Sequence, residues 1–482
     1  MAFTSFNFLA LVTLVVLLTQ CFASPLGRSL VLAAGSAVFM ASYLTAPLQI
    51  VPLAAFLALC YGMVMWVQAR PTHASLAISV TLVVASFIYL KKFSFLDGAA
   101  TLPFPYLVIG LSYILFRVIH ILVDASQGGL PAKIGPLAFF NYTSNFLAFV
   151  SGPIQRFQDY TGRSVAPLVL DEERVFAAFS RIITGFVKLA IVSAVANYFF
   201  TTLFASLSAK LLDPALIAWH SAVASYALAA SVYTIYLYYN FSGYMDIVIG
   251  VSWLIGLDLP ENFNRPFSSR NFLEFWSRWH MTLSDWFKVY VFNPLLKAMA
   301  MRIESPALGP YLGVIAFFVT FLIMGMWHGT TSVFLVYGLL LGTAASANKF
   351  WQIFMAKHLG KQGYKALAAK PVYAWFCTGL TFACFALALT CFWTDMPQLQ
   401  ALTSLLGFGG IVAALLSMAI VAAIALMATA TAGNWLAPRI ERWSLAARGL
   451  FARNLVLGAR VLAIAVVASF FHKAPEFVYR AF

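Results

Sequence analysis

The residues that could do chemistry gather in one stretch of the chain, from Tyr238 to Gly329. Two histidines stand out there, His280 and His328, because an imidazole titrates near neutral pH and can accept or release a proton. A single histidine near a helix end would more simply hold a structural hydrogen bond. The second histidine and the dense aromatic surroundings favour a functional role. The same stretch also holds the charged residues Asp246, Arg265, Glu274, Arg278 and Asp285.

The rest of the chain is compatible with hydrocarbon. Hydrophobic residues make up 62% of its 482 residues and charged residues 10%, with a mean hydropathy of +0.87, far from the averages of a soluble domain. Only helices and closed barrels satisfy every backbone group in lipid, and these apolar runs are continuous instead of alternating. The sequence therefore predicts an all-α, polytopic integral membrane bundle with about 11–13 transmembrane helices plus re-entrant or interfacial helices. An ionisable side chain inside such a bundle is a functional candidate by default.

The net charge of +14 is interpreted as a topology signal, because lysine and arginine fall mainly between the apolar runs and such residues favour cytoplasmic loops. No solvated basic domain is present to hold nucleic acid, so the lipid bilayer is the expected environment and nucleic acid is not an expected partner.

The first 24 residues lack the positive start of a signal peptide, which predicts a retained first span. Without an internal repeat, residues 1–482 are predicted to form a single membrane domain.

The elements that position the two histidines differ in pattern. Between Ser268 and Val291 charged residues at spacings of 4, 4, 7 and 3 predict one amphipathic helix, capped by Ser268 or Ser269, with His280 on its aromatic side. The charged side of that helix would carry Arg270, Glu274, Arg278, Asp285 and Lys288.

Glycines interrupt the chain at two other places. Gly325 and Gly329 have small-xxx-small spacing beside His328, which predicts either a close helix approach or a kink. Gly152-Pro153 breaks a helix, so that segment is either a re-entrant or bundle-lining turn or a simple loop at the membrane surface.

Several strings in a fixed order resemble the membrane-bound O-acyltransferase family, in its bacterial alginate O-acetyltransferase and teichoic-acid D-alanyl transferase branch. They are Ser-Gly-Pro-Ile-Gln-Arg-Phe at 151–157, Tyr-x-x-x-Gly-Tyr-x-Asp ending at 246, Asn-Phe-Asn-Arg-Pro-Phe at 262–267, Phe-Trp-Ser-Arg-Trp-His at 275–280 and Met-Trp-His-Gly at 326–329. Residues 3–9 also resemble that branch. The resemblance covers roughly residues 1–350, and Ser277 departs from the arginine that is common in the family.

This resemblance implies N-terminal helices over 1–140, a catalytic core over 141–350 and C-terminal helices with a tail over 351–482. It further implies a central tunnel, in which a cytoplasmic acyl thioester meets a hydroxyl acceptor from outside. His328 would be the catalytic histidine and His280 the second motif histidine. A neutral imidazole can take the proton of the attacking hydroxyl, and a dry tunnel protects the thioester from water. The substrate and tunnel residues would be Trp279, Trp327, Asp246, Tyr244, Arg265, Asn264, Arg278, Asp285 and Arg156.

The tail, Phe-Val-Tyr-Arg-Ala-Phe at 477–482, resembles the ending of bacterial acyl-transfer systems of this branch. Tyr479 would then hold the acyl group as a relay, with Arg480 as a phenolate stabiliser, and an extracytoplasmic transferase partner would complete the transfer. The alternative interpretation is that Tyr479 is an aromatic anchor at the membrane interface.

The sequence thus predicts an O-acyltransferase of the bacterial cytoplasmic membrane that passes an acyl group, acetyl or alternatively D-alanyl, to an exported polysaccharide or cell-wall glycan. The donor would be an acyl-CoA or a phosphopantetheine-carrier thioester. The sequence contains no nucleotide-binding glycine loop, so no tightly bound cofactor is expected. No metal is expected either, because the two histidines have no cysteine or carboxylate at ligand spacing. A transporter or flippase with broken helices is the alternative from another class.

Overall fold

A computed structural model describes residues 5–22, 24–96, 102, 104–130, 133–165, 170–212, 218–446 and 450–470. Within these residues the regular structure is helical, apart from one isolated bridge between Phe263 and Trp279. The predicted all-α class is confirmed.

Seven helical segments among the described residues are long and apolar enough to cross a membrane. They are Pro47–Ala69, His73–Lys91, Glu172–Ala209, Gly309–Trp327, Val333–Ala369, Pro371–Phe392 and Met396–Thr429. Three shorter apolar helices cover Phe6–Cys21, Pro25–Ala41 and Asn454–Val467. The chain is therefore a multi-pass membrane protein, and the exact number of crossings stays a prediction.

The chain divides into two compact units. The first unit holds the chain up to Phe186 together with Gly243–Glu261, and the second holds Val187–Ser242 with the chain from Asn262 to Pro475. Helix α10 (Trp219–Ile255) contributes to both. The Tyr-x-x-x-Gly-Tyr-x-Asp string that ends at Asp246 lies within this continuous helix, and no proline interrupts it there.

The helices of the first unit begin where the sequence supplies caps. Ser5 and Ser24 accept hydrogen bonds from the first turns of α1 and α2, and Thr72 forms a capping box at the start of α4. The helices are α1 (Phe6–Cys21), α2 (Pro25–Ala41), α3 (Val51–Ala69), α4 (His73–Lys91), α5 (Leu111–Ser126), α6 (Pro136–Ser144), α7 (Phe157–Val165) and α8 (Glu172–Val187). Helix α5 begins at Leu111, directly after Gly110, whose left-handed conformation with φ +85° is not helical.

A segment without regular structure, residues 145–156, lies between α6 and α7 and is buried except for Arg156. Its carbonyl groups need donors, since no helical ladder serves them. The buried Arg117 of α5 donates from Nη1 to the Thr143 carbonyl at 2.9 Å and from Nη2 to the Ala148 carbonyl at 2.7 Å. The Tyr244 hydroxyl donates to the Leu147 carbonyl at 2.9 Å. This burial favours the re-entrant or bundle-lining interpretation over a loop at the membrane surface.

The second unit is built around α10, α16 (Pro371–Ala388) and α17 (Met396–Ala446), whose small and apolar residues share one core. The core includes Ala222, Tyr226, Ala230, Ala383, Ala386, Ala414 and Met418. The remaining elements are η3 (Lys188–Ser193), α9 (Ala194–Leu212), η5 (Pro266–Ser268), α11 (Phe272–Trp276), α12 (Met281–Phe287), η6 (Lys288–Phe292), α13 (Asn293–Arg302), α14 (Gly309–Trp327), α15 (Val333–Ala369), η7 (Leu389–Phe392) and α18 (Leu450–Phe470). Small side chains allow these long helices to pack closely.

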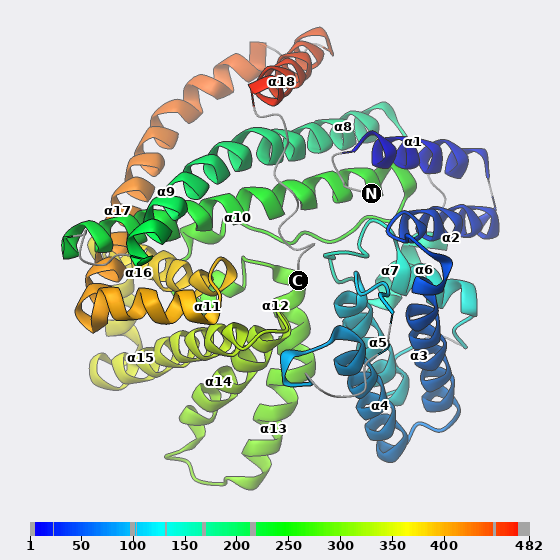
Figure 1. Ribbon diagram of the computed structural model, residues 1–482, viewed down its shortest axis with the longest axis horizontal. Helices are drawn as coiled ribbons and strands as arrows, with labels where there is room; N and C mark the ends of the chain where they lie inside the picture. The colour runs from blue at the N-terminus through cyan, green and yellow to red at the C-terminus, as the bar shows by residue number, and fades with distance from the viewer. Residues whose placement is uncertain are drawn as a thin grey trace. The chain divides into compact units, whose positions relative to one another are not determined.

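Helices α14 and α15 lie side by side (Figure 1) and approach each other through glycine. A Cβ atom at Gly325 would overlap the backbone of Gly338, and one at Gly329 would overlap the ring of Phe334. Of the two interpretations of the glycine spacing beside His328, the close helix approach is the one that is present.

The predicted amphipathic helix from Ser268 to Val291 is wrong as a single helix. It is divided into α11 and α12 by a break at His280, whose φ of +46° is left-handed. Asn271, not Ser268 or Ser269, caps α11 by accepting from the Glu274 amide at 2.9 Å. The helical spacing of the charges could not reveal the break, because the pairing partner of this segment lies elsewhere in the chain.

Replacing Gly325 with alanine should destabilise the protein, because the new methyl group would force α14 and α15 apart. Overpacking of this kind costs about 1–3 kcal/mol. Thermal unfolding of the purified protein in detergent measures the loss. Gly62→Ala in α3 is the matched control, since a Cβ atom there meets nothing within 4 Å. Equal stability of the two variants would contradict the close approach.

Replacing Arg117 with leucine should leave the Thr143 and Ala148 carbonyls without their donor. Hydrogen bonds to a charged group are worth roughly 1.5–3 kcal/mol each, so the thermal unfolding midpoint should fall clearly. Arg117→Lys should recover only part of the loss, because one ammonium lacks the forked geometry. Arg70→Leu removes an exposed arginine and is the control. An unchanged midpoint in Arg117→Leu would show that water serves these carbonyls.

Candidate active site

His280 lies at a backbone turn that distant residues hold in place. The Asn264 amide donates to the Arg278 carbonyl and the Met281 amide donates to the Asn262 carbonyl, both at 2.9 Å. Between these two bonds His280 adopts its left-handed conformation and begins α12. Such a conformation is unfavourable for a residue with a side chain and is concentrated at functional sites.

The His280 side chain is fully buried in the second unit. Its ring packs edge-on against Phe241 of α10 at 4.9 Å between centroids, and its Nδ1 lies 3.2 Å from Asn262 Oδ1. His280 lies outside the candidate membrane spans. Burial lowers the pKa of its imidazole well below the usual value, and the nearby His328 lowers this pKa further. The ring is therefore neutral at neutral pH.

His328 directly follows the last residue of α14 and is 3% exposed. Three aromatic rings surround it, with centroid distances of 4.9 Å to Trp327, 5.4 Å to Tyr337 and 5.5 Å to Phe392. Both histidines belong to the second unit, and His328 lowers the pKa of His280.

Trp279, beside His280, fills the centre of an aromatic cluster. It stacks on Phe275 at 5.6 Å and meets Phe385 of α16 edge-on at 4.8 Å. Phe263 packs against it at 5.1 Å. The indole, with 1% exposure, is therefore a buried apolar side chain next to His280.

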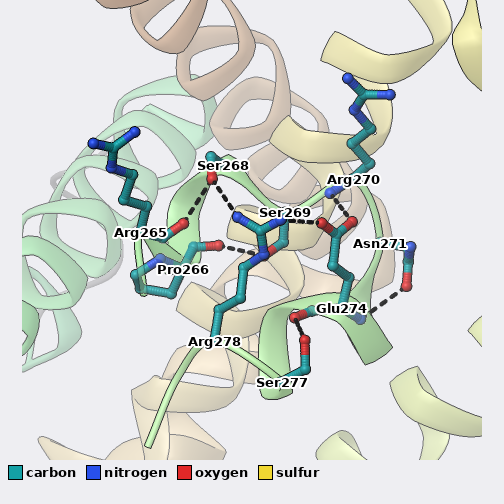
Figure 2. Close-up of polar contacts among 9 residues, drawn as sticks. All are labelled: Arg265, Pro266, Ser268, Ser269, Arg270, Asn271, Glu274, Ser277 and Arg278. Carbon is teal, nitrogen blue, oxygen red and sulfur yellow. Dashed lines mark hydrogen bonds and ion pairs between the residues drawn. The ribbon is translucent and has the colours of Figure 1, made fainter. Parts of the chain in front are cut away.

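A polar network holds the loop that leads into this turn (Figure 2). Arg278 donates to Glu274 at 2.7 Å and to the Ser268 hydroxyl at 3.1 Å. The second oxygen of Glu274 accepts from the Arg270 amide at 2.9 Å. The Ser268 hydroxyl in turn donates to the Arg265 carbonyl at 2.7 Å. Arg278 and Glu274 are thus placed as supports of the loop.

The other predicted site residues of the second unit are less enclosed. Asn264, Arg265 and Asp285 are exposed, while Trp327 is half-buried. Arg265 also has a left-handed backbone, with φ +46°. The Trp327 ring contacts the His328 ring at 4.9 Å between centroids.

Three predicted site residues belong to the first unit. Tyr244 is buried and holds the irregular segment, as described above. Asp246 pairs with Arg181 of α8 at 3.2 Å, and Arg181 also forms a forked pair with Glu261. Arg156 is exposed at the end of the irregular segment. The packing in this unit gives Tyr244 and Asp246 structural partners.

Tyr479 and Arg480 lie outside the described residues, so the relay stays a prediction. The tunnel also stays a prediction.

Two cavities lie among the described residues. One of about 560 Å³ is in the first unit, between Val51 and Phe104. Another of about 570 Å³ is in the second unit and is lined by Ser268, Arg270, Pro371 and Trp375 among others. Neither of these two cavities is lined by His280 or His328.

Sequence reasoning missed Asn262 as an individual residue, although it begins the Asn-Phe-Asn-Arg-Pro-Phe string. Its side chain is fully buried and its Oδ1 faces both His280 and Thr282. The available signal was the polar amide of Asn262 beside apolar residues. This signal did not identify the partner, because His280 lies 18 residues further along the chain.

Comparison with known proteins extends these observations to a family. The model of the membrane-bound O-acyltransferase family matches residues 38–389, a range that contains both histidines. The chain belongs to this family.

Two individual relatives with acyl-transferring names also match the chain. The chain is 29% identical over 255 residues to the teichoic acid D-alanyltransferase of Bacillus subtilis (strain 168), over 52% of this chain and 61% of that protein. It is 31% identical over 244 residues to the probable alginate O-acetylase AlgI of Azotobacter vinelandii, over 49% of this chain and 43% of that protein. The chain thus spans roughly half the length of the curated relatives it matches.

The buried neutral state of His280 predicts a pH dependence of stability. The unfolded chain binds a proton at this residue near pH 6.5, whereas the folded protein binds it only at much lower pH. Below pH 6.5 the unfolded state holds more protons, so stability falls as the pH falls, by up to about 1.4 kcal/mol per pH unit. Unfolding measured at pH 7 and pH 5 should show a smaller acid loss in His280→Gln than in the wild type.

The exposed His358 of α15 provides the control for that measurement. His358→Gln should lose as much stability at pH 5 as the wild type does. An identical acid loss in the wild type and in His280→Gln would mean that His280 is already able to hold a proton in the folded protein.

Proposed function

We propose that the protein is an O-acyltransferase that moves an acyl group from a cytoplasmic thioester to a hydroxyl of an exported polysaccharide or cell-wall glycan. An acetyl group is the first candidate for the acyl group. The observation that carries this proposal is the pair of buried histidines, His280 and His328, each of which packs against aromatic rings within the second unit. Family membership supports acyl transfer over the transporter alternative. The bacterial cytoplasmic membrane is the proposed location.

In this reaction His328 serves as the proton acceptor and then as the proton donor. The acceptor hydroxyl attacks the carbonyl carbon of the thioester while the neutral His328 imidazole takes the hydroxyl proton. The carbon–sulfur bond then breaks, and the departing thiolate receives the proton from the imidazolium. The rings of Trp327, Tyr337 and Phe392 keep water away from the reacting thioester. The donor is a coenzyme A or phosphopantetheine-carrier thioester.

D-alanyl transfer to a teichoic-acid-like polymer is the second candidate. It is favoured by the identity of 29% to the teichoic acid D-alanyltransferase of Bacillus subtilis, of which the chain covers 61%. The same imidazole chemistry serves both acyl groups, because each donor presents a thioester carbonyl.

Tyr479 is proposed as the first acceptor, from which an extracytoplasmic partner protein passes the acyl group to the glycan. Mass spectrometry of the C-terminal peptide, after incubation with acetyl-CoA or with a D-alanyl carrier thioester, tests this relay and identifies the donor. An acyl mass on Tyr479 that disappears in Tyr479→Phe is expected. A peptide without any adduct, while glycan acylation proceeds, would rule the relay out.

Replacing His328 with alanine should reduce acyl transfer by roughly 10²–10⁴-fold, because a positioned proton acceptor is lost. The measurement is the incorporation of labelled acyl groups by membranes that contain equal amounts of each variant. His358→Ala, at an exposed histidine of α15, should transfer at the wild-type rate. Full activity of His328→Ala would contradict the proposed role of His328 in proton transfer.

A further inference from the structure

The Asn262 side chain joins the turn at His280 to the start of α12. Its Oδ1 accepts from the Thr282 amide at 3.1 Å and from the Thr282 hydroxyl at 2.9 Å. The same oxygen lies 3.2 Å from His280 Nδ1. Asn262 and His280 are fully buried. One oxygen therefore meets three neighbouring polar groups.

These contacts determine which atom of the amide faces the ring. A backbone N–H can only donate, so the Asn262 atom opposite the Thr282 amide is the oxygen and not the nitrogen. His280 Nδ1 faces that oxygen, an acceptor, and must carry a hydrogen to form a bond. In a neutral imidazole the other nitrogen then bears the lone pair.

We propose that Asn262 is a positioning residue that holds His280 as the Nδ1–H tautomer, which leaves the lone pair on Nε2, where it can accept a proton or a hydrogen bond during acyl transfer. This inference rests on the proposed function. It gives Asn262 the role of selecting the His280 tautomer, because proton transfer or hydrogen bonding at His280 depends on which ring nitrogen carries the hydrogen. The opposite tautomer would turn the Nε2 acceptor into a donor.

Asn262 supplies a side-chain oxygen that faces a ring nitrogen of His280. Phe241 packs edge-on against the ring. Besides burial, two further influences act on the imidazole: the His328 imidazole, at the end of α14, lowers its pKa, and a hydrogen bond with the backbone of His280 raises it. The backbone pairing of residues 262–264 with 278–281 fixes the position of Asn262 relative to the ring.

The amide nitrogen of Asn262 makes a sharp substitution possible. Asn262 Nδ2 has no hydrogen-bond partner among the described residues. Asn262→Asp therefore keeps the accepting oxygen and removes no bond within the described residues, while it places a carboxylate opposite His280 Nδ1. Asn262→Ala removes the acceptor. Thr282→Val is the matched control, because it removes one donor to Oδ1 and leaves the contact with His280.

The first test reads the tautomer without any activity. The full chain is labelled with [¹⁵N]histidine in nanodiscs, and the imidazole nitrogen signals of His280 are identified by their loss in His280→Gln. The wild type and Thr282→Val should show a protonated Nδ1 and an unprotonated Nε2, whereas Asn262→Ala should lose this pattern. An Nε2–H tautomer in the wild type, or an unchanged pattern in Asn262→Ala, would overturn the proposal.

The second test is the pH profile of acyl transfer. In Asn262→Asp the acid limb should move to higher pH by roughly one to three units, because the carboxylate favours the protonated imidazole. Activity should return above that limb, whereas Asn262→Ala should be slower at every pH and Thr282→Val should keep the wild-type limb. Equal slowing of all three variants with an unmoved limb would mean a merely structural role and would overturn the proposal.

The two tests separate the two proposals. If the wild type transfers no acyl group while the nitrogen signals show the Asn262-dependent tautomer, the proposed function fails and the tautomer assignment stands. If transfer occurs and His328→Ala abolishes it, but the signals ignore Asn262, only the positioning role fails.

Discussion

The structure depends on donors and acceptors for backbone that is buried without being helical. Residues 145–156 are served by Arg117 and Tyr244 in the first unit. The turn at His280 is served by the pairing with residues 262–264 in the second unit. Unsatisfied backbone groups are costly away from water, so such segments persist only where side chains or distant backbone supply partners. Both segments overlap the strings that resemble the family, at 151–157, 262–267 and 275–280.

The same constraint explains the division of labour among the charged residues. Arg278 and Glu274 pair while also binding Ser268 and the Arg270 backbone, so their charges support a loop. Arg181 does the same for Asp246 and Glu261 in the first unit. Partly exposed pairs of this kind contribute little free energy individually. Arg278 and Glu274 shape the loop that leads to His280 in the second unit, and Arg181 holds Asp246 and Glu261 in the first.

The histidine neighbourhood is apolar except where geometry requires a polar group. His280 and His328 are enclosed by aromatic rings, and Asn262 is the amide that faces His280. An aromatic enclosure lowers the local dielectric and keeps the imidazoles neutral, which is the state that can accept a proton. Acyl transfer from a thioester needs the same dryness, since water is the competing acceptor.

The sequence by itself determined the helical membrane class and the family, and it pointed to His280 and His328 as candidates, because hydropathy, glycine spacing and motif strings are local properties. It could predict that Gly325 permits a close approach, but not that Gly338 is its partner. Only the tertiary structure decided that the helix breaks at His280, that Tyr244 and Asp246 serve the first unit, and that Asn262 faces the His280 ring. Those outcomes depend on contacts between residues distant in sequence, which no local spacing encodes.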